Sequence, residues 1–167
     1  MRTHIPPSSF PDALQIRTER GSLRYTKQPG FYAVHGPLPN NLQTAVELVL
    51  EDNTVTICRG EPALSADLPT SLKITPVYAL DPHGPLAIPT GQIFLRFTPD
   101  VKTDERRGNL ADHGYTVVRI PSYAPHTAWV QATNGDIATS LLNIEQLNGL
   151  PGLVNVEPQL LMQRKNR

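Results

Sequence analysis

The sequence of 167 residues predicts an α+β protein in which a ferredoxin-like carboxy-terminal domain follows a small, mostly-β module. The main observation is the order strand, helix, strand, strand, helix, strand within residues 91–162, because β-α-β-β-α-β is the ferredoxin-like arrangement. A second observation is a series of short, β-rich runs before residue 80. A third is the proline- and glycine-rich stretch 81–89, which we interpret as a linker.

Short strands separated by turns are predicted throughout the first half of the chain. Residues 1–20 contain prolines that break any regular element, so this segment is predicted to be irregular. A turn at Pro29-Gly30 predicts a hairpin. Residues 42–50 fit a short helix or a strand, but the turn residues 51–53 favour strand pairing. The predicted strands cover residues 22–26, 31–35, 46–50, 54–59 and 71–80.

The predicted domain organisation has three parts. Residues 1–20 form the lead-in, residues 21–88 the mostly-β module with its linker, and residues 89–167 the ferredoxin-like domain with an extended carboxy-terminal tail. The 17 prolines are about twice the usual share, which favours loops and edge strands over long helices.

The second domain begins with a strand and a helix. Residues 92–98 alternate between apolar and polar side chains, which predicts a half-buried strand. The strand ends at Pro99. Residues 101–113 are polar and compatible with a helix, for which Asp100 or Thr103 is a candidate N-cap.

Two strands, a second helix and a last strand follow. Residues 115–120 and 127–133 are predicted as strands from their β-branched and aromatic content. Residues 136–148 form the clearest predicted helix, because apolar residues recur on one face and Asp136 supplies an N-cap. A Gly-Leu-Pro-Gly turn ends this helix, and residues 153–157 are the last predicted strand.

The charge and hydropathy of the chain exclude several classes of partner. Lysine and arginine total 15, as do aspartate and glutamate, so the formal net charge is zero. This balance gives no electrostatic reason to expect binding to nucleic acid or to an anionic membrane. The amino terminus lacks the apolar core of a signal peptide, and no stretch is long enough to span a membrane. The sequence as written therefore predicts a cytoplasmic protein, unless it is a fragment of a longer chain.

Residues typical of catalytic and metal sites are scattered. The single cysteine, Cys58, excludes an intramolecular disulfide and is expected to be buried in a strand. The five histidines show no metal-ligand spacing, so we expect no metal and no cofactor. Asp81 and His83 resemble half of a catalytic pair but lie in a proline-rich turn. No nucleophile-elbow, P-loop or dinucleotide-binding motif occurs, and we expect no enzymatic activity and no catalytic residues.

Three segments of the second half resemble a known family. Pro89–Phe97, Gly114–Val118 and Leu150–Pro158 resemble the pro-region of bacterial subtilisin-like serine proteases, the subtilases. The last segment is the most specific, with a helix, a Leu-Pro-Gly turn and a strand that ends in Val-Glu-Pro. Residues 23–25 and 31–34 resemble the additional amino-terminal module of some long bacterial subtilases.

The resemblance implies a prodomain that binds, inhibits and assists the folding of a subtilisin-like protease catalytic domain, in cis or in trans. In that family the open face of the prodomain sheet lies on two surface helices of the protease, and the last strand continues as a tail into the substrate groove. The competing interpretation is a non-catalytic ferredoxin-like regulatory or oligomerisation module. The oligomeric state is not predicted.

The pleat of the strands predicts which side chains face a partner. Because successive side chains of a strand point to opposite faces, Ile93, Leu95 and Phe97 should face the helices. The open face then carries aromatic, arginine and amide side chains, which are typical of interface centres. Alternatively, Trp129 packs under the amino-terminal module and binds no partner. The predicted protease-binding face consists of Phe94, Arg96, Trp129, Gln131, Asn155 and Glu157.

The resemblance also implies an inhibitory tail. Glu157 matches a family position whose carboxylate caps a protease helix, although Gln159 stands in place of a second acid. Met162 would occupy an apolar pocket upstream of the cleavage point and Lys165 would lie next to it. The alternative is that residues 160–162 are the end of a buried strand. The predicted tail consists of Leu160, Leu161, Met162, Gln163, Arg164 and Lys165.

Overall fold

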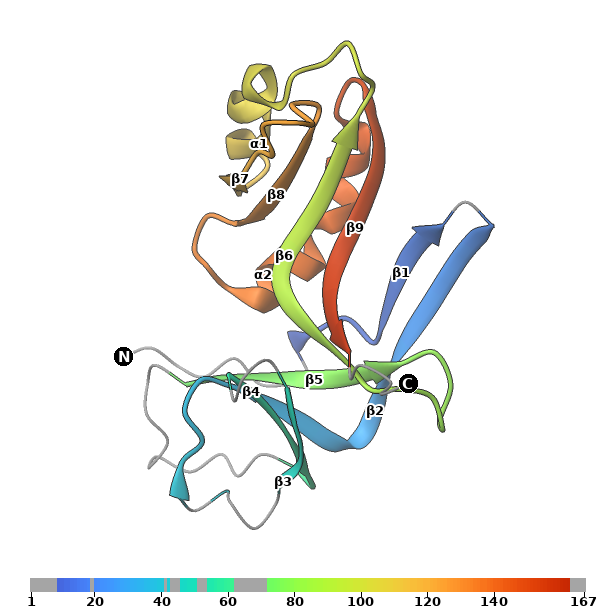
Figure 1. Ribbon diagram of the computed structural model, residues 1–167, viewed down its shortest axis with the longest axis vertical. Coiled ribbons are helices and arrows are strands. Elements are labelled where there is room, and N and C mark those ends of the chain that lie inside the picture. The colour runs from blue at the N-terminus through green and yellow to red at the C-terminus, as the bar shows by residue number, and fades with distance from the viewer. Residues whose placement is uncertain are drawn as a thin grey trace. The chain divides into compact units, whose positions relative to one another are not determined.

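Strands dominate the structure of this protein. The computed structural model describes residues 9–18, 20–40, 42, 46–50, 54–61 and 72–162 (Figure 1). Strands account for 51% and helices for 19% of it. The strands are β1 Ala13–Thr18, β2 Gly21–His35, β3 Val46–Leu50, β4 Val55–Arg59, β5 Lys73–Ala79, β6 Ala87–Phe97, β7 Tyr115–Arg119, β8 Thr127–Ala132 and β9 Leu153–Met162. The helices are η3 Thr103–Arg106, α1 Arg107–Asp112, α2 Ile137–Leu142 and η4 Ile144–Gly149, of which η3 and η4 are 3-10 helices.

The chain forms two compact units. Unit 1 consists of Met1–Ala13, Tyr25–Pro89 and Leu160–Arg167, and unit 2 consists of Leu14–Arg24 and Thr90–Gln159. Strands β1, β2, β6 and β9 each pass from one unit to the other. The sequence predicts a division near residue 88, but it does not indicate that the arm Leu14–Arg24 belongs to the second unit. Nor does it indicate that the chain returns to the first unit at Leu160.

Unit 1 is built on a sheet that is buried on both faces. Strand β2 pairs antiparallel with β4 and β5, so that Ala33 lies opposite both Ile57 and Thr75. Tyr32 and Val34 contribute to one apolar cluster, and Ala33 and Ile57 to another. The predicted pairing of residues 46–50 with residues 54–59 is confirmed, since β3 and β4 are antiparallel neighbours.

One prediction for the first half is wrong because a turn signal lies inside a strand. Residues 22–26 and 31–35 are predicted to be two strands of a hairpin, but both belong to the single strand β2. Gly30 has a φ of +87°, and the pairing of β2 with β5 shifts between Lys27 and Tyr32. Pro29-Gly30 therefore lies at an irregularity within one strand and does not reverse the chain. Residues 13–18, predicted to be irregular, form β1.

Unit 2 places its helices against one face of a sheet with the strand order β9-β6-β8-β7. Strand β8 pairs antiparallel with both β6 and β7. The helices lie on one side of these strands (Figure 1). Leu110 of α1 and Leu147 of η4 pack in one cluster with Ile93, Leu95 and Phe97 of β6, as the alternation of β6 predicts.

Hydrogen bonds fix the second helix to the sheet. The Tyr115 hydroxyl donates to the Ser140 carbonyl, and the Ser140 hydroxyl accepts from the Ala132 amide at 2.8 Å. Asp136 caps α2 as predicted, because its carboxylate accepts from the Thr139 amide. The predicted 136–148 helix is interrupted at Asn143, where α2 gives way to η4.

The first helical region differs from its prediction at its start. Residues 103–112 form η3 followed by α1, and the N-cap position of η3 is Lys102, which makes no capping side-chain bond. Neither Asp100 nor Thr103 is this cap. The buried Thr103 hydroxyl instead donates to the Thr127 carbonyl at 2.9 Å, which fixes the start of the helix to β8.

The predicted fold class, a ferredoxin-like domain preceded by a separate mostly-β module, is wrong. The strands form one mostly antiparallel nine-stranded sheet in the order β3-β4-β2-β5-β6-β8-β7, with β1 on β2 and β9 on β6. The composition of residues 81–89 predicts a linker, but β6 already begins at Ala87, which pairs with Tyr78 of β5. Strand β9 likewise extends to Met162 instead of ending at Glu157.

A half-buried histidine in unit 1 is expected to make stability depend on pH. Burial, together with the nearby Lys73 ammonium group, lowers the pKa of His35 from 6.5 to about 4. Its Nε2 lies 2.9 Å from the Thr75 hydroxyl. Since the unfolded chain takes up this proton at a higher pH than the folded chain, stability should be highest above pH 6.5 and should fall as the pH approaches 4. The loss should be on the order of 2–3 kcal/mol.

The replacement His35→Gln should flatten this part of the pH profile, because glutamine retains a hydrogen-bonding group and does not titrate. Urea unfolding midpoints at about pH 7 and about pH 4.5 measure the difference. The control is His83→Gln, which removes an exposed histidine. If His35→Gln lost as much stability on acidification as the unmodified chain, His35 would not be the group responsible.

Candidate protein-binding surface

Two aromatic side chains form the centre of the sheet face of unit 2 that lies opposite the described helices. Phe94 of β6 and Trp129 of β8 lie opposite one another in the strand register. Their ring centroids are 5.1 Å apart and their planes are tilted by 57°, a favourable arrangement for an aromatic pair. Their neighbours Ile93 and Val130 are fully buried on the other face, which the helices cover.

Polar side chains extend this face along the same two strands. Arg96 is exposed and Gln131 is half-buried, and both follow the alternation that places Phe94 and Trp129 on this face. The structure therefore brings together four of the six predicted face residues. We call the sheet face that carries these residues the aromatic surface. Its predicted members are Phe94, Arg96, Trp129 and Gln131.

Strand β7 adds two residues that the sequence does not indicate. Thr116 lies opposite Gln131, and Arg119 lies opposite Trp129. Paired residues share a face, so both side chains join the aromatic surface. The pairing of β7 with β8 shifts between Val117 and Arg119. This irregularity changes the phase of the alternation, and no residue in β7 signals it, so the position of Arg119 cannot be read from the sequence.

Two arginines therefore flank the aromatic pair. Arg96 and Arg119 are both exposed. Among the residues that the structure describes, the ion pairs are Lys27–Asp12, Arg59–Glu47 and Arg107–Asp104, so neither of these arginines forms an ion pair with a described carboxylate. The aromatic surface is thus apolar at its centre and positive at two points beside it.

The two predicted face residues on β9 do not belong to the paired strands β6, β8 and β7 that carry the aromatic surface. Asn155 and Glu157 are half-buried on β9, and Asn155 lines a separate pocket. The alternation of this strand predicts that Val154 and Val156 both face the core. Val156 does pack against the core cluster, whereas Val154 is 49% exposed. The alternation of β9 therefore does not hold at Val154. The proposed helix-capping role of Glu157 stays a prediction.

The predicted tail begins inside a strand. Leu160, Leu161 and Met162 are the last residues of β9 and belong to unit 1. Leu161 packs against the cluster that contains Ala33 and Ile57. The Tyr25 hydroxyl lies 3.8 Å from the Met162 sulfur, to which it donates a hydrogen bond. The remaining predicted tail residues, Gln163, Arg164 and Lys165, lie outside the described residues.

The described part of the chain shows no group suited to metal binding. No cluster of three or more histidine, cysteine, aspartate or glutamate side chains occurs among those residues. Cys58 is buried as predicted, and burial raises the pKa of its thiol, which favours the protonated form. Within the described ranges, no helix has the length and apolar content needed to cross a membrane.

Comparison of the chain with protein-family models, curated proteins and solved structures finds no match. An aromatic pair with two flanking arginines is suited to contact with another polypeptide, because such residues dominate the binding free energy of protein interfaces.

Proposed function

We propose that this chain is a non-catalytic protein-binding module and that its aromatic surface binds a subtilisin-like serine protease, in cis or in trans, inhibits it and assists its folding. The observation that carries the proposal is the Phe94–Trp129 pair on the sheet face that the helices leave uncovered. Arg96 and Arg119 beside it supply charged donors for carbonyl or carboxylate groups of the partner.

The choice of a protease as partner rests on the resemblance of Pro89–Phe97, Gly114–Val118 and Leu150–Pro158 to subtilase pro-regions. Where a sheet face meets the carboxy-terminal end of a partner helix, the exposed carbonyl groups of that helix favour cations. Arg96 and Arg119 are suited to such a contact. The aromatic pair would supply the apolar area at the centre of the interface.

Assistance with folding follows from selective binding. A partner that binds only the folded protease lowers the free energy of the folded state by about 2.7 kcal/mol when its concentration is about 100 times Kd. No catalytic group is needed for this effect. The same complex would slow the protease for as long as the chain blocks access to its cleft.

The position of Leu161 limits how the predicted tail could contribute to protease binding. Entry of Leu160–Met162 into a protease groove would require Leu161 to leave its cluster and Met162 to leave Tyr25. Full burial of a leucine side chain is worth about 1.5–3 kcal/mol, and Leu161 is half-buried, so the cost would be a fraction of that range. Binding by the aromatic surface does not require this rearrangement.

The experiment is an inhibition assay with the purified full chain. Increasing concentrations of the chain are added to a panel of subtilisin-like proteases, and the hydrolysis of a chromogenic peptide is followed. We expect one or more proteases to slow at micromolar concentration. Trp129→Ala should weaken inhibition at least about 30-fold, since truncating a central aromatic residue costs about 2 kcal/mol or more.

Tyr123→Ala is the matched control, because Tyr123 is an aromatic residue that is 89% exposed and lies outside the aromatic surface. This variant should inhibit like the unmodified chain. The proposal is contradicted if every protease in the panel is unaffected, or if the two variants lose inhibition equally. If the chain instead formed dimers, and Trp129→Ala dissociated them, the aromatic surface would be a self-association surface. The like charges of Arg96 and Arg119 disfavour such a dimer.

A further inference from the structure

A small pocket lies beside β9 in unit 2, away from the aromatic pair. Its volume is about 200 Å³, and it is lined by Arg17 of β1, Asn148 of η4 and residues Leu153–Val156 of β9. Pockets for drug-sized molecules and cofactors usually have volumes of about 300–1,000 Å³. This pocket is therefore suited to a single side chain or a comparably small group.

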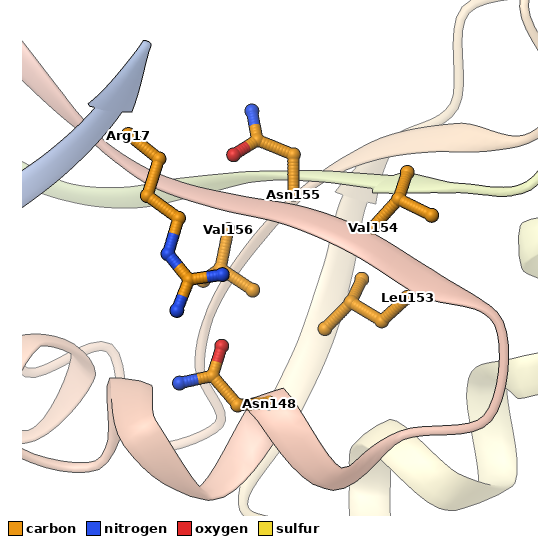
Figure 2. A pocket seen from close by; sticks show the side chains of 6 residues that line it. All are labelled: Arg17, Asn148, Leu153, Val154, Asn155 and Val156. Atoms are coloured by element: carbon orange, nitrogen blue, oxygen red, sulfur yellow. The ribbon is translucent and has the colours of Figure 1, made fainter. Parts of the chain in front are cut away.

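The polar groups of the pocket are suited to an anion. Figure 2 shows the guanidinium group of Arg17 and the carboxamide of Asn148 pointing toward one another, with Val156 nearby. None of the ion pairs formed by the described residues involves Arg17. A planar guanidinium binds a carboxylate through two parallel hydrogen bonds, and an amide N–H can donate to the same group.

The adjoining strand has an edge that can accept another strand. In the described part of the sheet, β9 pairs with β6 and with no second strand. Edge strands are usually protected by charged residues or proline, but residues Leu153–Val156 contain neither. Val154 on this strand is 49% exposed. Such an edge binds extended peptides through backbone hydrogen bonds.

We propose that an extended peptide segment carrying an aspartate or glutamate pairs with β9 at residues Leu153–Val156 and places its carboxylate between Arg17 and Asn148. The strand edge supplies affinity through the peptide backbone, and the pocket supplies selectivity for the acidic side chain. The site uses none of the residues of the aromatic surface. It therefore stands or fails independently of the proposed binding to a protease.

The test uses the full chain and a fluorescent peptide of alternating valine and threonine with one central glutamate, acetylated and amidated so that no terminal carboxylate is present. Fluorescence anisotropy should show that this peptide binds about tenfold more tightly than its glutamine analogue. Arg17→Gln should remove that difference, and Asn148→Ala should reduce it. Arg24→Gln is the matched control, because Arg24 is exposed in the same arm but does not line the pocket.

A second series tests the strand edge. Methylation of alternate backbone amides of the peptide should abolish binding in one of the two possible phases, because only one set of amides faces β9. The proposal is overturned by equal affinity for the glutamate and glutamine peptides, or by an Arg17→Gln variant that folds normally and binds unchanged. Tolerance of methylation in both phases, tighter binding of a phosphoserine peptide, or absence of binding at millimolar concentration would also overturn it. The proposal would likewise be overturned if free acetate displaced the bound fluorescent peptide at the same concentration as the unlabelled glutamate peptide does.

Discussion

Replacement of Phe97 by alanine is expected to destabilise unit 2 by about 3–5 kcal/mol. Phe97 is fully buried in the cluster formed by β6 and the helices, where Leu95, Leu110 and Leu147 surround it. Removing the ring leaves a cavity that the paired strands on either side of β6 cannot close. Urea unfolding followed by the fluorescence of Trp129, the single tryptophan, measures the loss within unit 2.

Phe94→Ala provides the matched control, with the same substitution on the opposite face of the same strand. Phe94 is half-buried and contacts Trp129, so its truncation should cost about 1 kcal/mol, mainly from the aromatic pair. The comparison therefore tests which face of β6 belongs to the core. Equal losses in the free energy of unfolding for the two variants would contradict the assignment of Phe94 to the aromatic surface.

Gly91→Ala is expected to destabilise unit 2 by about 2–4 kcal/mol. Gly91 has a φ of +86°, a conformation that L side chains rarely adopt. A Cβ atom at this position would lie 3.1 Å from Ile137 Cγ1 and 3.3 Å from Ile137 Cα. The close approach brings the start of α2 onto β6, so relief of the contact would require the helix to move away from the sheet.

Gly108→Ala should change the stability in the opposite direction. Gly108 lies in α1, and a Cβ atom there would meet nothing within 4 Å. Alanine is favoured over glycine within helices by about 1 kcal/mol, so this variant should be as stable as the unmodified chain or more stable. Thermal unfolding of the two variants side by side gives the comparison. Equal thermal midpoints would show that the Gly91–Ile137 approach does not constrain the fold.

Alternation within the strands is enough to locate the centre of the candidate surface from the sequence. Ile93, Leu95 and Phe97 are buried, and Phe94 and Trp129 meet on the other face. Such a pattern is informative because the side-chain period of a strand is two, so that one buried face fixes the other. The capping of α2 by Asp136 is predictable for a similar reason, since its signal is local.

Features that depend on pairing between distant strands could not be predicted. The shift between Val117 and Arg119 brings Arg119 opposite Trp129, and it depends on β8 rather than on the sequence of β7. Pro29-Gly30 has the composition of a chain reversal but lies within β2, because β5 pairs with this strand both before and after the two residues. The predicted fold class is wrong for the same reason: β6 continues into a stretch whose local composition indicates a linker.

The two proposed sites make different demands on a partner. The aromatic surface offers apolar area with two flanking cations, whereas the pocket at Arg17 offers one cation beside a strand edge. A protein that bound to both sites would need a flat contact surface and an acidic, extended segment. Arg17→Gln combined with Trp129→Ala in a double-mutant cycle would show whether one partner engages both, because independent sites give additive losses.

The most direct test of protease binding through the aromatic surface follows Trp129 itself. Because it is the only tryptophan, a chain made with fluorotryptophan gives one fluorine resonance that reports on this side chain. On addition of a subtilisin-like protease that the chain inhibits, we expect this resonance to shift or broaden as the indole is buried, and we expect Arg96→Gln to weaken the change. If the protease were inhibited while the Trp129 resonance stayed unaltered, the partner would be bound elsewhere on the chain and the aromatic surface would not be the binding site.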